Sequence, residues 1–302
     1  MPKVSVLIAV YNGQEHVATA LKSVQDQTYR DYETIVIDDG SKDDTAAVVE
    51  RFPDVRLIRQ ENSGIGYTRQ RLVEEAEGEW LAFLDHDDFW EPTKLERQVE
   101  QTDDNVGLVH SLCTYFYPGG LVEPRTWRPP EDDCVLDHLL PDCMVNTGSC
   151  LLRRETLLQV GGFDQSLSIA EDWLAWFMMA SKTDFRFVPE NLSWILRRPV
   201  SASTPNVKWY EGERHVLQDL ILPRLDELYG RLPMETRNRF RRIAQRKLAV
   251  MASLQAEAHD LAGERNEARL RHLEAIKRAP GMRGAWLRYV RHLASPNPKQ
   301  IA

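Results

Sequence analysis

The sequence predicts an α/β fold with a doubly wound, mostly parallel sheet, followed by an all-helical C-terminal region. Three observations support this prediction. Short apolar, β-branched runs alternate with helical patterns in the first part of the chain, Asp-rich turns end several of these runs, and only helical patterns remain after about residue 207. We therefore assign residues 1–206 to one α/β domain and residues 207–302 to a helical region.

The first part of the chain alternates strands and helices. Residues 4–10, Val-Ser-Val-Leu-Ile-Ala-Val, form a nearly continuous apolar run that is typical of a strand buried on both faces. Apolar residues then recur at helical spacing between residues 16 and 24. The alternation continues with a strand at 34–37, a helix at 45–49, a strand at 55–58, a helix at 66–76 and a strand at 80–84. This order predicts a parallel sheet whose ligands bind at the carboxyl ends of its strands.

Less regular patterns follow Pro92. We expect a helix at 93–101, a strand at 106–112, an irregular Pro-rich insertion at 113–135, a strand at 145–152, a helix from 155 that stops at Gly161, a helix at 170–179 and strands at 185–188 and 192–197. Helical patterns then occupy 210–229, 234–259, 264–278 and 283–293, and proline or glycine separates them.

Charge is distributed unevenly along the 302 residues. Of the 38 Lys and Arg and the 46 Asp and Glu, residues 231–302 hold 16 and 6, so this segment carries +10 and the preceding residues carry −18. Such an acidic body argues against nucleic-acid binding. The basic segment suits an acidic protein surface, an anionic membrane or an anionic acceptor. Its densest part, residues 237–247, is either a solvated helix face or a lipid contact.

Composition also indicates a compartment. No apolar run reaches the roughly 20 residues of a membrane span, and the chain begins with a strand pattern in place of a signal peptide. The four cysteines form no Cys-x-x-Cys pair, which argues against a zinc ribbon or a disulfide framework. We therefore expect a cytoplasmic protein, with peripheral contact at the inner face of the membrane as an alternative.

Three carboxylates, Asp85, Asp87 and Asp88, follow the predicted strand at 80–84. Like charges this close repel one another unless a cation neutralises them, and a divalent metal that carries phosphate oxygens is such a cation. Asp38 and Asp39 end an earlier strand and should lie at the same edge of the sheet. The pattern predicts a metal–diphosphate site. A solvated acidic turn, with the earlier pair as turn and cap residues, is the alternative.

Several short motifs occur in a fixed order between residues 3 and 197. They are Val4–Asn12, Gln27-Thr28-Tyr29, Asp38-Asp39-Gly40-Ser41, Asn62-Ser63-Gly64-Ile65-Gly66, Ala76-Glu77-Gly78-Glu79-Trp80, Phe83-Leu84-Asp85-His86-Asp87-Asp88, Gly161-Gly162-Phe163-Asp164 and Glu171-Asp172-Trp173. Together they resemble the inverting family-2 glycosyltransferases with a GT-A fold. The resemblance implies that residues 1–206 are a catalytic domain that moves a sugar from a nucleotide donor, expected to be a UDP-sugar, to a hydroxyl of a glycan or lipid-linked acceptor.

The resemblance also implies a nucleotide site. Ala9 and Tyr11 would lie against the nucleoside, and Asp39 would accept a hydrogen bond from the ring N–H of the base. Arg69 would contact the nucleotide, although Arg71 is placed to share or replace that role, because the sequence here departs from the usual pattern of the family. A carboxylate suits an imide donor, and an arginine suits a diphosphate.

The metal ligands follow from the same resemblance. Asp85 would hold the ribose or the water shell of the metal, and Asp87 would coordinate Mn or Mg directly. Asp88 would orient this site, and His86 would pack without binding the metal. The ion would stabilise the leaving diphosphate as a Lewis acid.

The resemblance also implies that Asp172 is the general base, and its position agrees, because the start of a helix favours a charged carboxylate that can take the proton of the acceptor hydroxyl. An ordinary carboxylate in the first turn of a helix is the alternative. Glu171 would position the acceptor or the base. The side that faces the acceptor and the sugar would be lined by Asn146, Gly148, Ser149 and Trp173, although tryptophans such as Trp173 more often belong to a core.

Two other readings compete with this one. A dinucleotide-dependent oxidoreductase would need a glycine-rich loop after the first strand, and Gly64-Ile65-Gly66 neither lies there nor has the third glycine. A non-catalytic nucleotide-sugar-binding or scaffold protein of the same fold is the second alternative. Under either reading, the helical region could serve dimerisation, acceptor binding or membrane association. The family resemblance implies that an enzyme of this kind assembles a surface polysaccharide.

Overall fold

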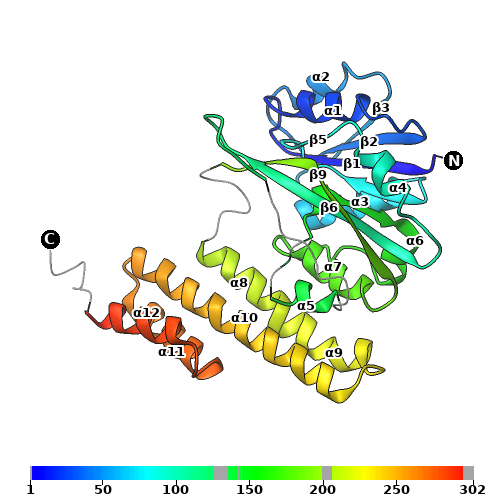
Figure 1. Ribbon diagram of the computed structural model, residues 1–302. Coiled ribbons are helices and arrows are strands. Elements are labelled where there is room, and N and C mark those ends of the chain that lie inside the picture. Colours follow the sequence, from blue (N-terminus) through cyan, green and yellow to red (C-terminus); the bar gives the residue numbers. More distant parts are fainter. Residues whose placement is uncertain (1, 125–134, 142, 144, 199–205, 295–302) are drawn as a thin grey trace. The chain divides into compact units, whose positions relative to one another are not determined.

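The computed structural model describes residues 2–124, 135–141, 143, 145–198 and 206–294. The chain divides into two compact units: residues 1–135 with 144–199, and residues 136–143 with 200–302. The assignment of residues 1–206 to a catalytic domain stays a prediction, and part of its boundary, residues 199–205, lies outside the described residues. Figure 1 labels most of the helices and strands.

A nine-stranded mixed sheet forms the centre of the first unit, in the order β3-β2-β1-β4-β8-β6-β9-β5, with β7 paired to β6. The first four strands are β1 (Val4–Val10), β2 (Tyr32–Asp38), β3 (Val55–Arg59) and β4 (Trp80–Phe83), and they are parallel to their neighbours among themselves. They are connected by α1 (Val17–Gln25), α2 (Thr45–Val49) and α3 (Ile65–Glu75). The predicted alternation of strands and helices is confirmed.

The rest of this unit adds antiparallel pairs. Its elements are β5 (Phe89–Trp90), α4 (Lys94–Val99), β6 (Val106–Phe116), β7 (Val122–Pro124), β8 (Cys150–Arg153), α6 (Arg154–Gln159), α7 (Glu171–Met179) and β9 (Asp184–Leu196). β8 is antiparallel to both β4 and β6, whereas β6 and β9 are parallel. The doubly wound sheet is thus extended by a mixed half.

Three predicted boundaries were wrong. The strand expected at 145–152 begins at Cys150, because Asn146 caps a 3-10 turn at Thr147–Ser149 through a 2.9 Å hydrogen bond from the Gly148 N–H to its side chain. The two strands expected at 185–188 and 192–197 are one strand, β9, whose register against β6 shifts between them. The insertion expected from residue 113 contains the end of β6 and all of β7, and residues 125–134 lie outside the described residues.

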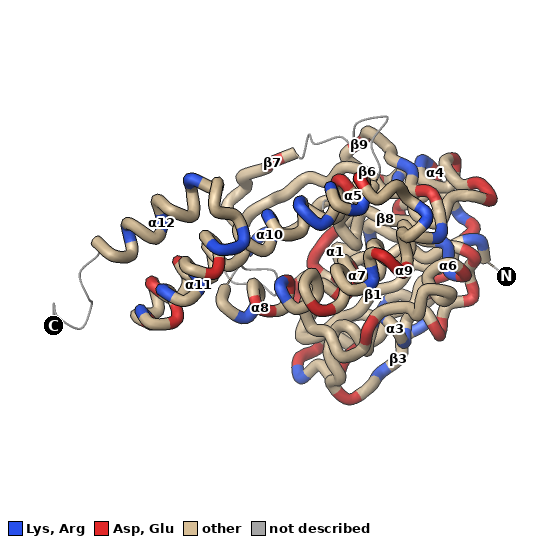
Figure 2. The backbone as a smooth tube through the Cα atoms, turned by 90° about the horizontal axis from the view of Figure 1, so that it is seen from below, with Lys and Arg blue, Asp and Glu red and all other residues tan. Residues whose placement is uncertain are grey.

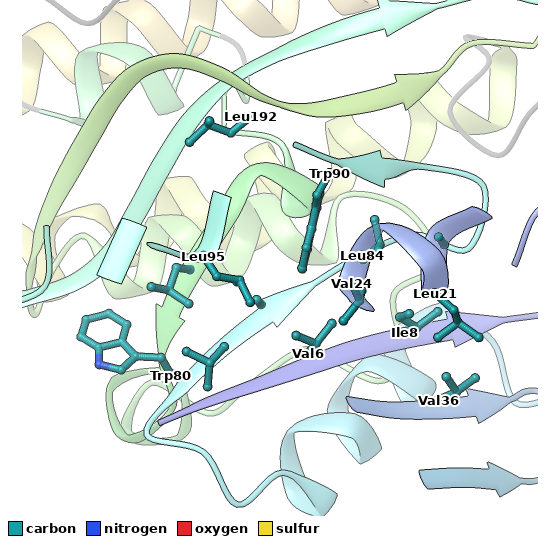
Figure 3. Packing of buried hydrophobic residues seen from close by; sticks show 14 of the residues in the cluster. Val6, Ile8, Leu21, Val24, Val36, Trp80, Leu84, Trp90, Leu95 and Leu192 are labelled. Carbon is teal, nitrogen blue, oxygen red and sulfur yellow. The ribbon is translucent and has the colours of Figure 1, made fainter. Parts of the chain in front are cut away.

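The core explains why the first strands are apolar at nearly every position. Side chains of β1 such as Val6 and Ile8 pack with Leu21 and Val24 of α1, and all four are at most 2% exposed (Figure 3). The same cluster continues to Trp90, whose indole Nε1 donates to the Gly148 carbonyl oxygen at 2.9 Å. The core therefore anchors the turn that begins at Asn146.

The second unit is helical. It contains α5 (Leu136–Leu139), α8 (Val207–His215), a π-helical segment (Val216–Ile221), α9 (Leu222–Tyr229), α10 (Met234–Leu261), α11 (Arg265–Arg278) and α12 (Arg283–Ala294). Buried residues of α10 recur every three or four positions, which is the pattern of a helix packed on one side. The predicted helical C-terminal region is confirmed.

The basic segment at 237–247 is largely paired within this unit. Arg237 and Arg241 contact Asp226, and Arg239 donates to Asp137 at 2.7 Å. Arg242 and Arg246 are exposed and line a cavity of about 1040 Å³. No helix within the described residues is long and apolar enough to cross a bilayer.

Candidate active site

The three carboxylates after β4 lie in a tight turn at the carboxyl end of the parallel strands. The Asp88 N–H donates to the Asp85 carbonyl oxygen at 3.0 Å, which closes the turn. The imidazole of His86 packs against Gly13, where a Cβ atom would come within 2.6 Å of its Cδ2. Any larger residue at position 13 would have to displace the side chain of His86 or Val10, because the loop after β1 approaches the acidic turn this closely.

Arg69 of α3 connects the acidic turn to the start of α7. Its guanidinium donates through Nη2 to Asp85 Oδ1 at 3.0 Å and through Nη1 to Glu171 Oε1. Burial works to lower the pKa of Arg69, but the charges of Asp85, Glu171 and Asp172 outweigh burial and raise it. For the acidic partner Glu171, burial has the opposite effect and raises the pKa, whereas the charge of Arg69 works to lower it.

Replacing Arg69 by methionine is expected to lower the free energy of unfolding by about 3–5 kcal/mol, because Glu171 would remain buried without its cation. Urea denaturation of the full chain measures this effect. Arg71→Met on the same helix is the matched control, because Arg71 is only half-buried, and its expected cost is below about 1 kcal/mol. Equal losses in the two variants would contradict the structural role of Arg69.

Asp87 and Asp88 have different surroundings. Asp87 pairs with Arg198, which follows β9. Asp88 is only 4% exposed and accepts from the Leu196 N–H at 2.8 Å. Burial raises the pKa of Asp88 well above its ordinary value, and the charges of Asp85 and Asp87 raise it further. The negative form of Asp88 is therefore unfavourable beside Asp85 and Asp87.

The loop at residues 60–64, which follows β3, holds the side chain of Asp39 by hydrogen bonds. Its Oδ1 accepts from Gln60 Nε2 at 2.7 Å and from the Ser63 N–H at 2.8 Å, and its Oδ2 accepts from the Gly64 N–H at 3.0 Å. Arg71 reaches the same group, because its Nη1 donates to Gln60 Oε1 at 2.8 Å. The two arginines of α3 thus serve different places: Arg69 the acidic turn and Arg71 the Asp39 loop.

The other two nucleotide-site residues follow β1. Ala9 is half-buried near the end of the strand, where it pairs with Ile37 of β2. Tyr11 comes just after the strand and is 42% exposed. Its ring is therefore accessible at the same edge of the sheet as Asp39.

Asp172 lies in the first turn of α7. Ala170, the residue before the first residue of this helix, has a left-handed backbone with φ of 61°, which is unfavourable for a residue that carries a Cβ atom. Asp172 Oδ2 accepts from Thr147 Oγ1 at 2.6 Å, and Oδ1 accepts from the Trp173 N–H at 2.8 Å. These contacts fix the orientation of a half-buried carboxylate at a helix N-terminus.

The turn at 146–149 lies between Asp172 and the acidic turn. Thr147 contacts Asp172, and a Cβ atom at Gly148 would lie 3.7 Å from Asp88 Oδ2. Ser149 is 1% exposed and donates to the Asn146 carbonyl oxygen at 2.8 Å. Trp173 is also 1% exposed, so its ring offers almost no surface to an acceptor. Its contact with an acceptor stays a prediction.

Sequence reasoning missed three contacts of this site: Arg198 at Asp87, Gln60 at Asp39, and Thr147 at Asp172. Thr147 lay in a motif singled out for the acceptor side, but its bond to Asp172 joins residues 25 positions apart. The pair Arg197-Arg198 directly after a strand was the available signal for a cation near the acidic turn.

The residues of the acidic turn suit Mn or Mg. Carboxylate oxygens are the ligands that these hard cations prefer, and the raised pKa of Asp88 reflects an excess of negative charge in addition to burial. Asp87 and Asp85 offer the carboxylates.

Comparisons with known proteins point to one family. The profile of glycosyl transferase family 2 matches residues 5–161. The chain is 36% identical over 225 residues to a Bacillus subtilis protein named as the teichuronic acid biosynthesis glycosyltransferase TuaG, which covers 70% of this chain and 85% of that protein. It is 37% identical over 118 residues to the B. subtilis protein EpsH, also named as a glycosyltransferase, but spans only 34% of its length. It is 43% identical over 174 residues to the uncharacterized glycosyltransferase alr2836 of Nostoc sp., and these residues are 54% of each chain.

Solved structures share the fold. The Staphylococcus aureus protein TarS, residues 1–349 in complex with UDP-GlcNAc, superimposes with a TM-score of 0.67 at 16% identity, covering 97% of this chain and 92% of that one. A mannosyltransferase from Pyrobaculum calidifontis in complex with GDP-Man and Mn²⁺ gives 0.58 at 19% identity, covering 99% and 82%. With the family profile and TuaG, these findings show that the chain belongs to glycosyl transferase family 2 and has the GT-A fold.

Proposed function

We propose that the protein is an inverting glycosyltransferase that moves a sugar from a nucleoside diphosphate donor to a hydroxyl of a glycan or lipid-linked acceptor. One observation carries this proposal. Arg69 joins the acidic turn to the first turn of α7, so that the carboxylates suited to a metal–diphosphate and the carboxylate suited to a base belong to one connected site.

Asp172 is the proposed base. Its carboxylate accepts the proton of the acceptor hydroxyl while the acceptor oxygen forms a bond to the anomeric carbon. The bond from that carbon to the diphosphate oxygen breaks, and its electron pair leaves with the diphosphate. The hydrogen bonds from Thr147 and the Trp173 N–H hold the carboxylate in place, and the helix N-terminus favours its negative charge. Glu171, paired with Arg69, positions this turn.

The donor side is proposed at the acidic turn and the Asp39 loop. Asp87 and Asp85 would hold Mn or Mg, which when bound supplies the positive charge that stabilises the leaving diphosphate. Arg198 pairs with Asp87 here, so metal binding requires Arg198 to move. Tyr11, Ala9 and Asp39 would receive the nucleoside. The complex of the P. calidifontis mannosyltransferase with Mn²⁺ supports the choice of metal.

Relatives support a class of donor and product. TarS was crystallised with UDP-GlcNAc, which favours UDP, whereas the mannosyltransferase was crystallised with GDP-Man. TuaG is named for teichuronic acid biosynthesis, which supports the assembly of a surface polysaccharide that the family resemblance implies. We adopt UDP-sugar as the donor on this basis.

The first test is titration of the purified protein with UDP, GDP and dTDP, each with and without Mn²⁺ or Mg²⁺, followed by turnover of the matching sugar donors. We expect metal-dependent binding of UDP and release of UDP from one UDP-sugar. Binding without any release, for all donors and with added glycan or lipid-linked acceptors, would favour the non-catalytic scaffold. No binding at all would contradict the donor site.

A peripheral membrane contact is proposed at α12. Its exposed apolar residues follow helical spacing, so they share one side of the helix: Trp286 at 46%, Leu287 at 60%, Val290 at 57% and Leu293 at 58% exposure. Arg283 and Arg291 lie on the same helix, and Figure 2 shows the charges along it. An apolar side with arginines suits the surface of an anionic bilayer.

Replacing Leu287 and Val290 by serine is expected to weaken binding to phosphatidylglycerol vesicles at least several-fold, because bilayer binding scales with the apolar area buried. Vesicle sedimentation measures this. Leu261→Ser is the control, because Leu261 is 91% exposed at the end of α10 and lies off this helix. Wild-type protein that stays in the supernatant would contradict the proposal, and self-association without vesicles would indicate a dimer surface.

A further inference from the structure

Three polar side chains from successive helices meet inside the helical unit. They are Asp260 of α10, His272 of α11 and His292 of α12. His292 Nδ1 lies 2.7 Å from Asp260 Oδ1, and His272 Nε2 lies 3.4 Å from Asp260 Oδ2. One ligand atom from each residue lies within 4.8 Å of the other two. These residues are far apart in the sequence and belong to none of the motifs of the glycosyltransferase site.

The two histidines of this triad are buried, whereas its aspartate is partly exposed. His272 is 1% exposed and His292 is 5% exposed, and the ring of Tyr289 stacks on His292 with an interplanar angle of 13°. The Asp260 carboxylate keeps 28% of its surface exposed. The triad therefore has a closed, imidazole-lined side and one side that is open to solvent, where a water ligand has access.

The chemistry of His272 favours metal binding. Its Nε2 faces Asp260 across 3.4 Å, which is a long hydrogen bond, and its buried Nδ1 has no hydrogen-bond partner within the described residues, so hydrogen bonds alone hold this ring only weakly. His292 brings a second imidazole nitrogen to the same place, and the Asp260 carboxylate oxygens lie between the two rings.

We infer that Asp260, His272 and His292 bind one transition-metal dication of the zinc type. Two imidazole nitrogens and one carboxylate oxygen form a ligand set that Zn²⁺ accepts, with water completing the tetrahedron. This set differs from the carboxylates of the donor turn, which suit Mg²⁺ and Mn²⁺. The bound ion would connect α10, α11 and α12 and hold α12 in place.

Metal titration of the full chain, purified without a histidine tag and treated with chelator, tests this inference. We expect one equivalent of Zn²⁺ to bind and to raise the unfolding temperature by about 5 °C when zinc is in hundredfold excess over its Kd. Co²⁺ is the spectroscopic probe, because its visible absorption reports nitrogen and oxygen ligands in a tetrahedral site. Asp87→Asn should retain both signals, which separates this site from the donor turn.

Asp260→Asn and His292→Gln should weaken zinc binding by more than about 100-fold, since each removes a direct ligand. His259→Gln is the matched control, because His259 is a buried histidine of α10 that contacts Glu264 outside the triad. Circular dichroism verifies that each variant is folded, and Asp260→Asn preserves the shape of the side chain. Absence of zinc binding to the wild type, or unchanged binding in both triad variants, would overturn the inference. Either result leaves the glycosyltransferase proposal untouched.

Discussion

Asp172→Asn is expected to lower kcat for sugar transfer by about 10²–10⁴-fold, the usual contribution of a general base. Asparagine has the shape of aspartate: its Oδ1 can still accept from the Trp173 N–H, and its amide NH2 can donate to Thr147 Oγ1 in the place of the second carboxylate oxygen, so the fold of this turn should be retained. It cannot take the proton of the acceptor hydroxyl. Initial rates of UDP release with saturating donor and acceptor measure the loss.

The informative feature of this variant is the separation of binding from chemistry. Metal-dependent affinity for the nucleotide should stay within a few-fold of wild type, because Asp172 contacts no proposed donor ligand. Asp184→Asn, at an exposed aspartate at the start of β9 that belongs to none of the motifs, is the control and should retain full activity. If Asp172→Asn kept wild-type kcat, the base would have to be another group, and Asp172 would only organise the turn around Thr147.

Asp87→Asn is expected to weaken metal-dependent nucleotide binding by about 100-fold, because it removes the negatively charged ligand proposed for Mn or Mg. The substitution also leaves Arg198 without its carboxylate partner. Isothermal titration with UDP, with and without Mn²⁺, separates the two effects: the loss should appear only when metal is present.

Asp54→Asn serves as the control for Asp87→Asn, because Asp54 is an exposed aspartate before β3. A second prediction about the same variant concerns Asp88. Burial remains the main cause of its raised pKa, so removal of the Asp87 charge should lower that pKa only in part. Equal weakening of UDP binding with and without metal would contradict a direct role for Asp87 at the ion.

Local sequence patterns predicted much of the fold. The apolar run of β1 and the helical spacing of α1 were correctly located, because burial on both faces or on one side of a helix leaves a periodic pattern in adjacent residues. The acidic turn was found for the same reason, since Asp85, Asp87 and Asp88 are neighbours in the chain. The start of β8 was wrong, because the Asn146 cap diverts an apolar segment into a 3-10 turn.

The sequence by itself thus determined the alternation of strands and helices, the position of the acidic turn at a strand end and the helical character of the second unit. Only the tertiary structure decided which charges are paired: Arg69 with Glu171, 102 residues away, and Arg198 with Asp87, 111 residues away. It likewise brought Asp260, His272 and His292 together. Periodicity depends on burial of adjacent residues, whereas these contacts depend on how whole elements pack, and no local pattern records that packing.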